Sequence, residues 1–126
     1  MRALKKEYDA VEAVINKFVE AIHASDSQIV KPYFVDSAHL YGNAGGVIEQ
    51  EPIQTLMHNI DACGELSKNV DFRMDVIALE ENVAVVCLLE EGMGDADFTN
   101  YFTLLKIDGN WKILIHAYNQ NSDTIK

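Results

Sequence analysis

The chain has 126 residues, 48% of them hydrophobic, and its 20 acidic and 10 basic residues give a formal net charge of -10. A folded chain of this length buries roughly two-thirds of the surface that the unfolded chain exposes, which suffices for one domain without disulfides or metals. The negative charge repels phosphate backbones and anionic lipids, so we expect neither nucleic acid nor a membrane as a partner. No apolar run reaches the roughly 20 residues of a membrane span. Charges also stand where a signal peptide needs apolar residues, so we expect a cytoplasmic protein.

The first half of the sequence predicts helices. Apolar residues recur at spacings of three and four, as on one face of a helix, at Leu4, Tyr8, Val11, Ile15, Phe18 and Ile22. We expect this helix to end near residues 23–25, and Asp26 to cap a short second helix over residues 28–31, which Pro32 limits. A third helix is predicted to start at Pro52 and to end before Gly64.

The second half predicts strands joined by short turns. Residues 70–76 alternate between apolar and polar, and the apolar run 83–89 follows a turn. Two further strands, near 98–107 and 111–119, flank Asp108-Gly109, a strong signal for a two-residue hairpin turn. Such short connections force a four-stranded antiparallel meander, and a short strand is expected over residues 38–41. The prediction is an α+β fold, one domain over residues 1–126, with three N-terminal helices packed on one face of a curved sheet.

Acidic residues dominate the middle of the chain. No Lys or Arg occurs from Met74 to Leu105, whereas seven acidic residues do: Asp75, Glu80, Glu81, Glu90, Glu91, Asp95 and Asp97. We interpret them as solvated strand ends and turns, the alternative being a patch for a cationic ligand. Two cysteines, Cys63 and Cys87, do not make a disulfide framework. The glycine-rich residues 42–46 are interpreted as a flexible loop near the mouth of a pocket.

Two short segments carry a family resemblance: Pro-Tyr-Phe-Val-Asp-Ser-Ala at 32–38 and Asp-Gly-Asn-Trp-Lys-Ile at 108–113. With this order of elements, the chain from about Glu7 to Gln120 resembles the nuclear transport factor 2-like superfamily, also called SnoaL-like or cystatin-like. Within it the layout is most similar to the group described as putative lumazine-binding. The resemblance implies a cone with an apolar cavity. That superfamily holds steroid isomerases, scytalone dehydratase, polyketide cyclases and pure binding domains, so the resemblance alone does not establish a function.

Steroid isomerases offer a sharper comparison, because their chemistry depends on a few placed groups. They use a tyrosine on the first helix and an acid on a late strand as oxyanion donors, with a carboxylate base on the first strand. The resemblance aligns Phe18 with the tyrosine, Gly42 with the base and residues 101–103 with the acid. None of these residues can supply the required group, so we predict no steroid isomerase activity.

The same alignment implies which side chains face the cavity. They are Phe18, Ile22, Phe34, Leu40, Gly42, Met57, Phe102, Ile115, Ala117 and Asn119, and strand alternation adds Asn100. The cavity is therefore expected to be apolar, with Asn100 and Asn119 as its main polar groups, as small-molecule pockets generally are. The alternative is that these positions simply pack as core.

We expect a domain that binds a small apolar or heteroaromatic ligand. No cofactor is expected, and the four histidines show no metal-binding spacing. The first alternative is a cofactor-independent isomerase, dehydratase or cyclase in which His39, Tyr41 or His58 acts as acid or base. A further alternative is a non-catalytic dimeric protein with a filled cavity. The missing carboxylate base favours binding over catalysis.

The last strand also suggests an assembly. If Ile115, Ala117 and Asn119 face inward, alternation turns Leu114, His116 and Tyr118 outward onto the convex sheet face. Exposed aromatic residues are enriched at interfaces. We therefore predict a homodimer with two-fold symmetry through this face, as the resemblance also implies.

Overall fold

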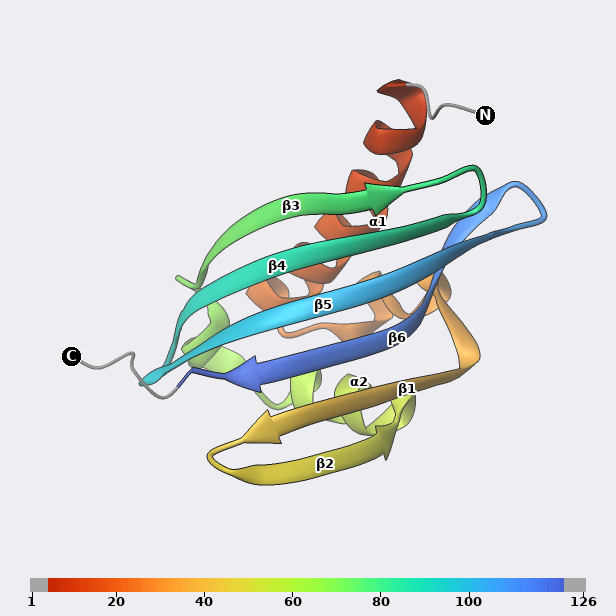
Figure 1. Cartoon of the computed structure of the whole chain (residues 1–126). Helices are drawn as coiled ribbons and strands as arrows, with labels where there is room; N and C mark the ends of the chain where they lie inside the picture. Colours follow the sequence, from red (N-terminus) through yellow and green to blue (C-terminus); the bar gives the residue numbers. More distant parts are fainter. Residues whose placement is uncertain (1–4, 122–126) are drawn as a thin grey trace.

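The computed structural model describes residues 5–121 and shows helices lying against one face of a curved sheet (Figure 1). Its elements in chain order are helix α1 (Lys5–Ala24), two 3₁₀ turns (Ser27–Ile29 and Lys31–Tyr33), strands β1 (Phe34–Ala44) and β2 (Val47–Pro52), helix α2 (Ile53–Asp61), a 3₁₀ turn (Gly64–Ser67), and strands β3 (Asp71–Leu79), β4 (Val83–Met93), β5 (Ala96–Ile107) and β6 (Asn110–Gln120). No helix among the described residues is long and apolar enough to cross a membrane.

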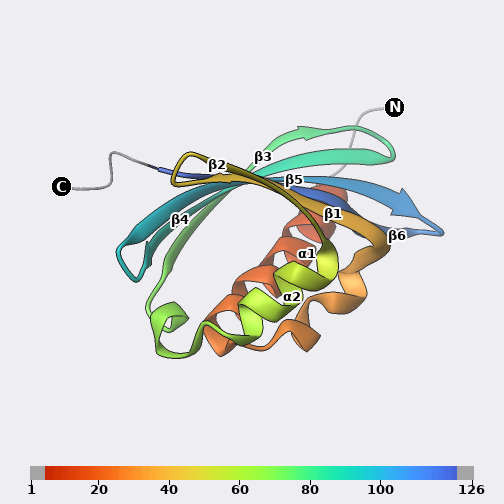
Figure 2. The same cartoon turned by 90° about the horizontal axis from the view of Figure 1, so that it is seen from below.

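The strands form one sheet in the order β2-β1-β6-β5-β4-β3. All neighbours pair antiparallel except β1 and β6, which are parallel. The sheet curves around α1 and α2, which lie on its concave side (Figure 2). In the described part of the chain no helix covers the convex side. The predicted α+β class and the meander β3 to β6 are confirmed.

Helix α1 packs its apolar stripe onto the concave face. Its buried residues are Val11, Val14, Ile15, Phe18, Ala21 and Ile22. The ring of Phe18 meets Phe102 of β5 edge-on, with centroids 4.9 Å apart, and each fully buried Phe contributes about 1.5–3 kcal/mol. Tyr8, also predicted on the stripe, is exposed, and Leu4 lies outside the described residues.

Polar contacts fix both ends of this helical layer. Near the start of α1, Glu7 accepts hydrogen bonds from Lys106 Nζ at 2.8 Å and from Trp111 Nε1 at 3.2 Å, which ties the helix to the β5–β6 hairpin. The hydrogen bond from Lys106 is the main cause that lowers the pKa of Glu7. After α1, Asp61 of α2 accepts from the backbone N and from Oγ of Ser27. The first set of contacts holds α1 against the sheet, and the second holds α2 against the turn that follows α1.

Three local features differ from the sequence-based predictions. The strand expected over residues 38–41 is part of the longer β1, and the glycine-rich segment is the turn of a β1–β2 hairpin rather than a flexible loop. Gly45 and Gly46 turn the chain with positive φ angles, and Asn43 Oδ1 accepts from Gly46 N at 2.8 Å. The predicted second helix is two 3₁₀ turns, because Pro32 has no N–H to continue a helical ladder.

A bulge in β6 reverses the predicted orientation of its last residues. Leu104 and Thr103 of β5 pair with Ile113 and Ile115, so Leu114 is an extra residue in the ladder. Because one extra residue inverts the alternation that follows, His116 is buried while Ile115 is 41% exposed.

The predicted orientations of five residues are therefore wrong. Ile115, Ala117 and Asn119 alternate with the pocket-lining residues of β6, so they belong to the convex side rather than the cavity. His116 and Tyr118 face the concave side rather than the predicted interface. Leu114 is the half-buried bulge residue. Beyond the bulge, simple alternation counted from the sequence therefore assigns each side chain to the wrong face of the sheet.

Candidate functional site

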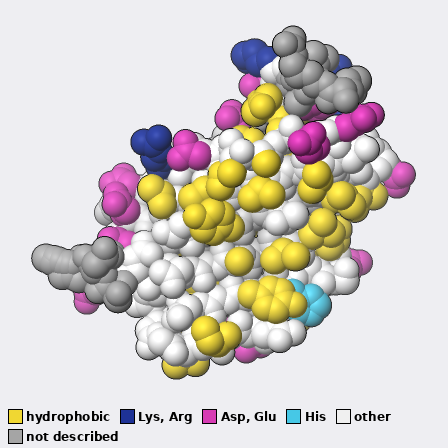
Figure 3. Space-filling view, viewed as in Figure 1, with side chains coloured by type: hydrophobic (Ala, Val, Ile, Leu, Met, Phe, Trp, Pro, Cys, Tyr) yellow, Lys and Arg dark blue, Asp and Glu magenta, His cyan; other side chains and the backbone are white. Residues whose placement is uncertain are grey.

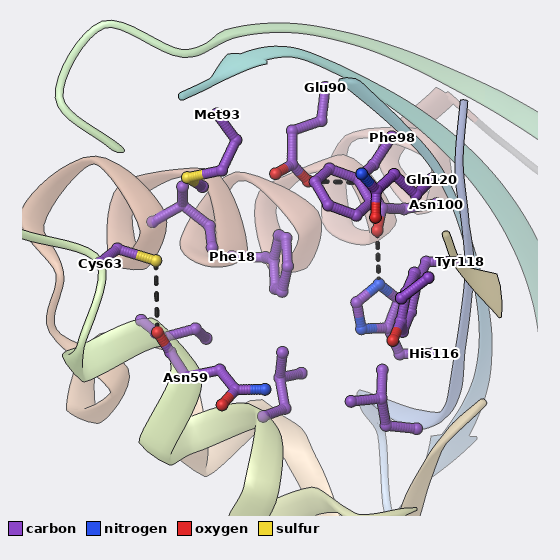
Figure 4. A pocket seen from close by; sticks show the side chains of 15 residues that line it. Phe18, Asn59, Cys63, Glu90, Met93, Phe98, Asn100, His116, Tyr118 and Gln120 are labelled. Carbon is purple, nitrogen blue, oxygen red and sulfur yellow. Dashed lines mark hydrogen bonds between the residues drawn. The ribbon is translucent and has the colours of Figure 1, made fainter. Parts of the chain in front are cut away.

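A pocket of about 230 Å³ lies between the two helices and the concave face of the sheet. Three of its lining residues, Ala44, Met93 and Gln120, are the last residues of β1, β4 and β6. Its full lining is Phe18, Ile22, Leu40, Ala44, Leu56, Asn59, Ile60, Cys63, Glu90, Met93, Phe98, Asn100, His116, Tyr118 and Gln120. Apolar walls with a few convergent polar groups are typical of small-molecule sites; Figure 4 shows these groups around the open centre.

The carboxylate of Glu90 is the acidic group of this pocket. It follows Ala84, Val86 and Leu88 on the inward face of β4 and is only 6% exposed. Its Oε1 accepts a hydrogen bond from Asn100 Nδ2 at 2.9 Å. Burial raises the pKa of Glu90, because the charged carboxylate loses its hydration, and the bond from Asn100 opposes this only in part.

His116 lies beside this carboxylate and is linked to it through Asn100. Its Nε2 is 2.7 Å from Asn100 Oδ1, and its ring stacks on Phe102 at 4.5 Å with the edge of Phe18 against it. The side chain is 3% exposed, and burial lowers the pKa of His116 to about 3. The histidine is therefore neutral at physiological pH. Glu90, Asn100 and His116 form a continuous hydrogen-bonded row along one wall (Figure 4).

Tyr118 forms the next part of the wall, and a glycine makes room for it. A Cβ on Gly42 of β1 would lie 2.2 Å from Tyr118 Cε1, so only glycine fits beneath the ring. The hydroxyl of Tyr118 donates to Glu49 Oε1 of β2, and its ring meets Phe98 edge-on at 5.9 Å. Gly42 was predicted to face the cavity in the position of a steroid isomerase base. The structure gives it a steric role instead.

The opposite wall comes from α2 and the turn after it. Asn59 lines the pocket, and its backbone oxygen accepts from Cys63 Sγ at 3.2 Å. Burial raises the pKa of Cys63, so this thiol is a poor nucleophile in its resting state. Among residues 5–121, no group of three or more His, Cys, Asp or Glu side chains is placed to hold a metal ion.

The structure brings some of the predicted cavity residues together and separates others. Phe18, Ile22, Leu40 and Asn100 line the pocket. Phe102 is buried directly behind the wall, against His116. Phe34 and Met57 are also buried, but they line a separate hollow beside the first 3₁₀ turn.

The residues proposed from the sequence as acid or base lie elsewhere. His39 and Tyr41 project from the convex side of β1, and His58 is exposed on α2 outside the pocket lining. The expectation that the pocket lacks a carboxylate is also wrong, because Glu90 of β4 places one there. The sequence holds one signal for Glu90: it continues the every-second-residue spacing of Val86 and Leu88. That signal is ambiguous because every residue from 83 to 89 is apolar, so either face of the strand could be buried.

Comparison with known proteins gives results that agree with this architecture. Residues 6–119 match the model of the family described as putative lumazine-binding. A relative from Cladobotryum sp., aldolase FrzH, is 32% identical over 116 residues, which cover 89% of this chain and 92% of the relative. A nuclear transport factor 2-like protein of unknown function from Shewanella baltica superposes with a TM-score of 0.88 at 25% identity, covering 98% of this chain and all of that one. A similar protein of unknown function from Methylobacillus flagellatus gives a TM-score of 0.88 at 24% identity over 96% of this chain and 97% of its own. The chain therefore belongs to the putative lumazine-binding family within the nuclear transport factor 2-like fold.

Proposed function

We propose that the pocket binds a small, mainly apolar carbonyl compound and removes a proton from the carbon next to the carbonyl group, without a cofactor. The observation that carries the proposal is the Glu90 carboxylate, buried in an apolar pocket and held by Asn100. A carboxylate with a raised pKa is a stronger base than a solvated one, and enzymes raise Glu pKa values by burial for this purpose.

In the proposed step, a Glu90 oxygen takes the proton, and the electrons of the C–H bond move into the carbonyl group to form an enolate. The negative charge then lies on the substrate oxygen and needs a hydrogen-bond donor. The side-chain amides of Asn59 and Gln120 line the pocket and are available as donors. Asn100 keeps the Glu90 carboxylate in place throughout.

The relative from Cladobotryum sp. supports this choice of chemistry. It is named an aldolase and is 32% identical to this chain. Aldol addition requires a nucleophilic carbon next to a carbonyl, and removal of a proton from that carbon creates one. The proposal for this chain is limited to the proton transfer, since the pocket does not identify the second reactant.

Deuterium exchange tests the proposal directly. Acetophenone, 4-hydroxyacetophenone and phenylacetaldehyde are incubated with the protein in D₂O, and loss of the α-proton signals is followed by ¹H NMR. We expect exchange above the buffer rate for at least one of them, and a 10²- to 10⁴-fold loss in Glu90→Gln. Glu91→Gln is the matched control, because Glu91 is the exposed neighbour on the same strand. Exchange at the buffer rate with all three compounds would reject the proposal, as would full activity in Glu90→Gln.

A second candidate function is binding without chemistry. It is favoured by the aromatic side chains around the pocket, Phe18, Phe98 and Tyr118, and by the uncharged state of His116. Such walls suit a flat heteroaromatic ligand, because aromatic rings prefer stacked or edge-on contacts with one another. Tight binding of such a compound that is unchanged in Glu90→Gln, together with absent exchange, would favour this function.

We also propose that the convex face joins two copies of the chain, through residues other than those first predicted. Cys87, Tyr101, Ala117 and Tyr41 lie side by side across β4, β5, β6 and β1, and Tyr101 is 46% exposed. Hydrophobic side chains occupy the centre of this face, while acidic ones lie toward its edges (Figure 3). An apolar centre with charges at the rim allows two chains of net charge -10 to meet, and salt should strengthen the contact.

Sedimentation at micromolar concentration in moderate salt tests this assembly. We expect a dimer that dissociates in Tyr101→Glu, which places a charge in the centre of the contact, and that persists in His58→Glu on the helical side. A monomeric wild-type protein, or a dimer indifferent to Tyr101→Glu, would contradict it.

A further inference from the structure

The orientation of the Asn100 side chain is fixed by two acceptors on one side of it. Its Nδ2 lies 3.2 Å from the backbone oxygen of Leu88 and 2.9 Å from Glu90 Oε1. Both partners accept hydrogen bonds, so the NH₂ group must face them. Exchanging the amide oxygen and nitrogen would place three oxygens against one another in a buried site.

This orientation determines which nitrogen of His116 carries the proton. Asn100 presents Oδ1, a pure acceptor, to His116 Nε2 at 2.7 Å. Nε2 must therefore be the N–H donor, and Nδ1 of the neutral ring keeps its lone pair. The hydrogen bonds among Glu90, Asn100 and His116 therefore suffice to place the ring proton of His116 on Nε2.

The Nδ1 atom is a buried acceptor without a donor among the described residues. Leaving a buried acceptor unsatisfied costs about 1–3 kcal/mol, and native structures seldom contain one without a reason. Figure 4 shows this second ring nitrogen on the edge of His116 that faces the interior of the pocket, away from Asn100. The aromatic rings beside it, Phe102 and Phe18, offer no hydrogen-bond donor.

We propose that His116 Nδ1 is a recognition point of the pocket and accepts a hydrogen bond from a hydroxyl or N–H group of the ligand. The proposal rests on the proposed function and narrows its substrate class to carbonyl compounds that also carry such a donor, for example on an aromatic ring. A site that bonds a donor in this way discriminates against analogues that lack it, because they leave the buried nitrogen unpaired. In this arrangement Glu90 acts on the carbon while His116 sets the orientation of the ligand.

Phenol and anisole form the test pair, because they differ only in that the donor hydrogen is replaced by a methyl group. Protein labelled with ¹⁵N-histidine is titrated with each compound, and the ring nitrogens of His116 are observed by NMR. We expect a protonated Nε2 and a bare Nδ1 in the free protein, and a shift of the Nδ1 resonance on adding phenol but not anisole. The ratio of phenol to anisole affinity should fall about tenfold in His116→Phe, the worth of one hydrogen bond. It should be unchanged in His58→Phe, since His58 lies outside the pocket.

Each outcome decides the proposal. A proton on Nδ1 in the free protein, or an Nδ1 resonance that phenol leaves unmoved up to its solubility, overturns it. Equal effects of phenol and anisole also overturn it, because the contact is then not made through the donor. The wild-type measurement stands even if His116→Phe does not fold. No turnover enters the experiment, so it can succeed where deuterium exchange fails, and the reverse also holds.

Discussion

Replacing His116 with Phe should change how stability depends on pH. The ring is buried against Phe102, and burial lowers its pKa from the ordinary 6.5 to about 3. In the unfolded chain the same group takes up a proton near pH 6.5, so below that pH the unfolded state binds more protons than the folded one. The free energy of unfolding must then fall as pH falls from about 6.5 to about 3. At 1.36 kcal/mol per pKa unit, the full loss from this residue is about 5 kcal/mol, as an upper limit.

The His116→Phe variant has a lower free energy of unfolding at pH 7, but it lacks the loss of stability on acidification that His116 causes. Phe fills most of the same space, yet it leaves Asn100 Oδ1 without its donor, at a cost of about 1–3 kcal/mol at pH 7. The wild type has lost about 2 kcal/mol from His116 by pH 5. The two stability curves should therefore cross near pH 5, with the variant the more stable of the two at pH 4.

Urea unfolding at half-unit steps from pH 7 to pH 4 measures this crossing. The difference between wild type and variant cancels the titrations that the two proteins share. His58→Phe serves as control, because His58 is exposed and its removal should leave the curve parallel to that of the wild type. A wild-type minus His116→Phe difference that stays constant across this range would refute the reasoning, since His116 would then titrate alike in both states.

Three further substitutions test the row of polar groups and the wall beside it. Glu90→Gln should raise Tm at pH 7 by about 2–5 °C, because it removes a buried charge and keeps an acceptor for Asn100; an unchanged or lower Tm in calorimetry would contradict this. Asn100→Leu should cost about 3 kcal/mol in urea unfolding, because it leaves both Glu90 and His116 Nε2 unpaired, and a cost under 1 kcal/mol would speak against the row. Gly42→Ala should cost about 1–3 kcal/mol and displace the Tyr118 ring, visible in its near-ultraviolet circular dichroism; an unchanged spectrum would mean that the ring does not rest on Gly42.

The fold was predictable because its elements follow local patterns. The stripe of α1, the alternation of β3 and the Asp108-Gly109 turn all appear in the sequence at their structural positions, and both turn residues have positive φ as this hairpin type requires. The β1–β2 hairpin was missed. Its second strand, Val47–Pro52, carries Glu49 and Glu51 and is mostly exposed, so it lacks the apolar signal of a core strand. This strand is held in place by its hydrogen-bonded pairing with β1, and no local pattern in the sequence indicates that pairing.

The site was predictable only where a face could be assigned without ambiguity. Phe18 and Ile22 follow from helical spacing, and Asn100 from alternation with Phe102. The predicted orientations of the β6 residues were wrong because one inserted residue, Leu114, shifts the alternation. Nothing in an apolar run marks which residue forms a bulge. Glu90 was not predicted as a pocket residue for a different reason. A carboxylate after an apolar run is usually solvated, and the burial of this one depends on contact with Asn100, ten residues away in the chain.

The identity of residue 90 bears on the choice between catalysis and simple binding. A glutamine there would accept the same hydrogen bond from Asn100 and would avoid the cost of burying a charge. The glutamate therefore adds nothing to stability that a glutamine would not supply. The two side chains differ in that the carboxylate can take up a proton and the amide cannot. His116 shows the same pattern, since its burial lowers stability in acid while its Nδ1 stays unpaired. Glu90 costs stability at neutral pH, His116 costs it only in acid, and each presents an acceptor in the same pocket, as is expected of a site that handles protons. They are not required of a cavity that only encloses an apolar molecule.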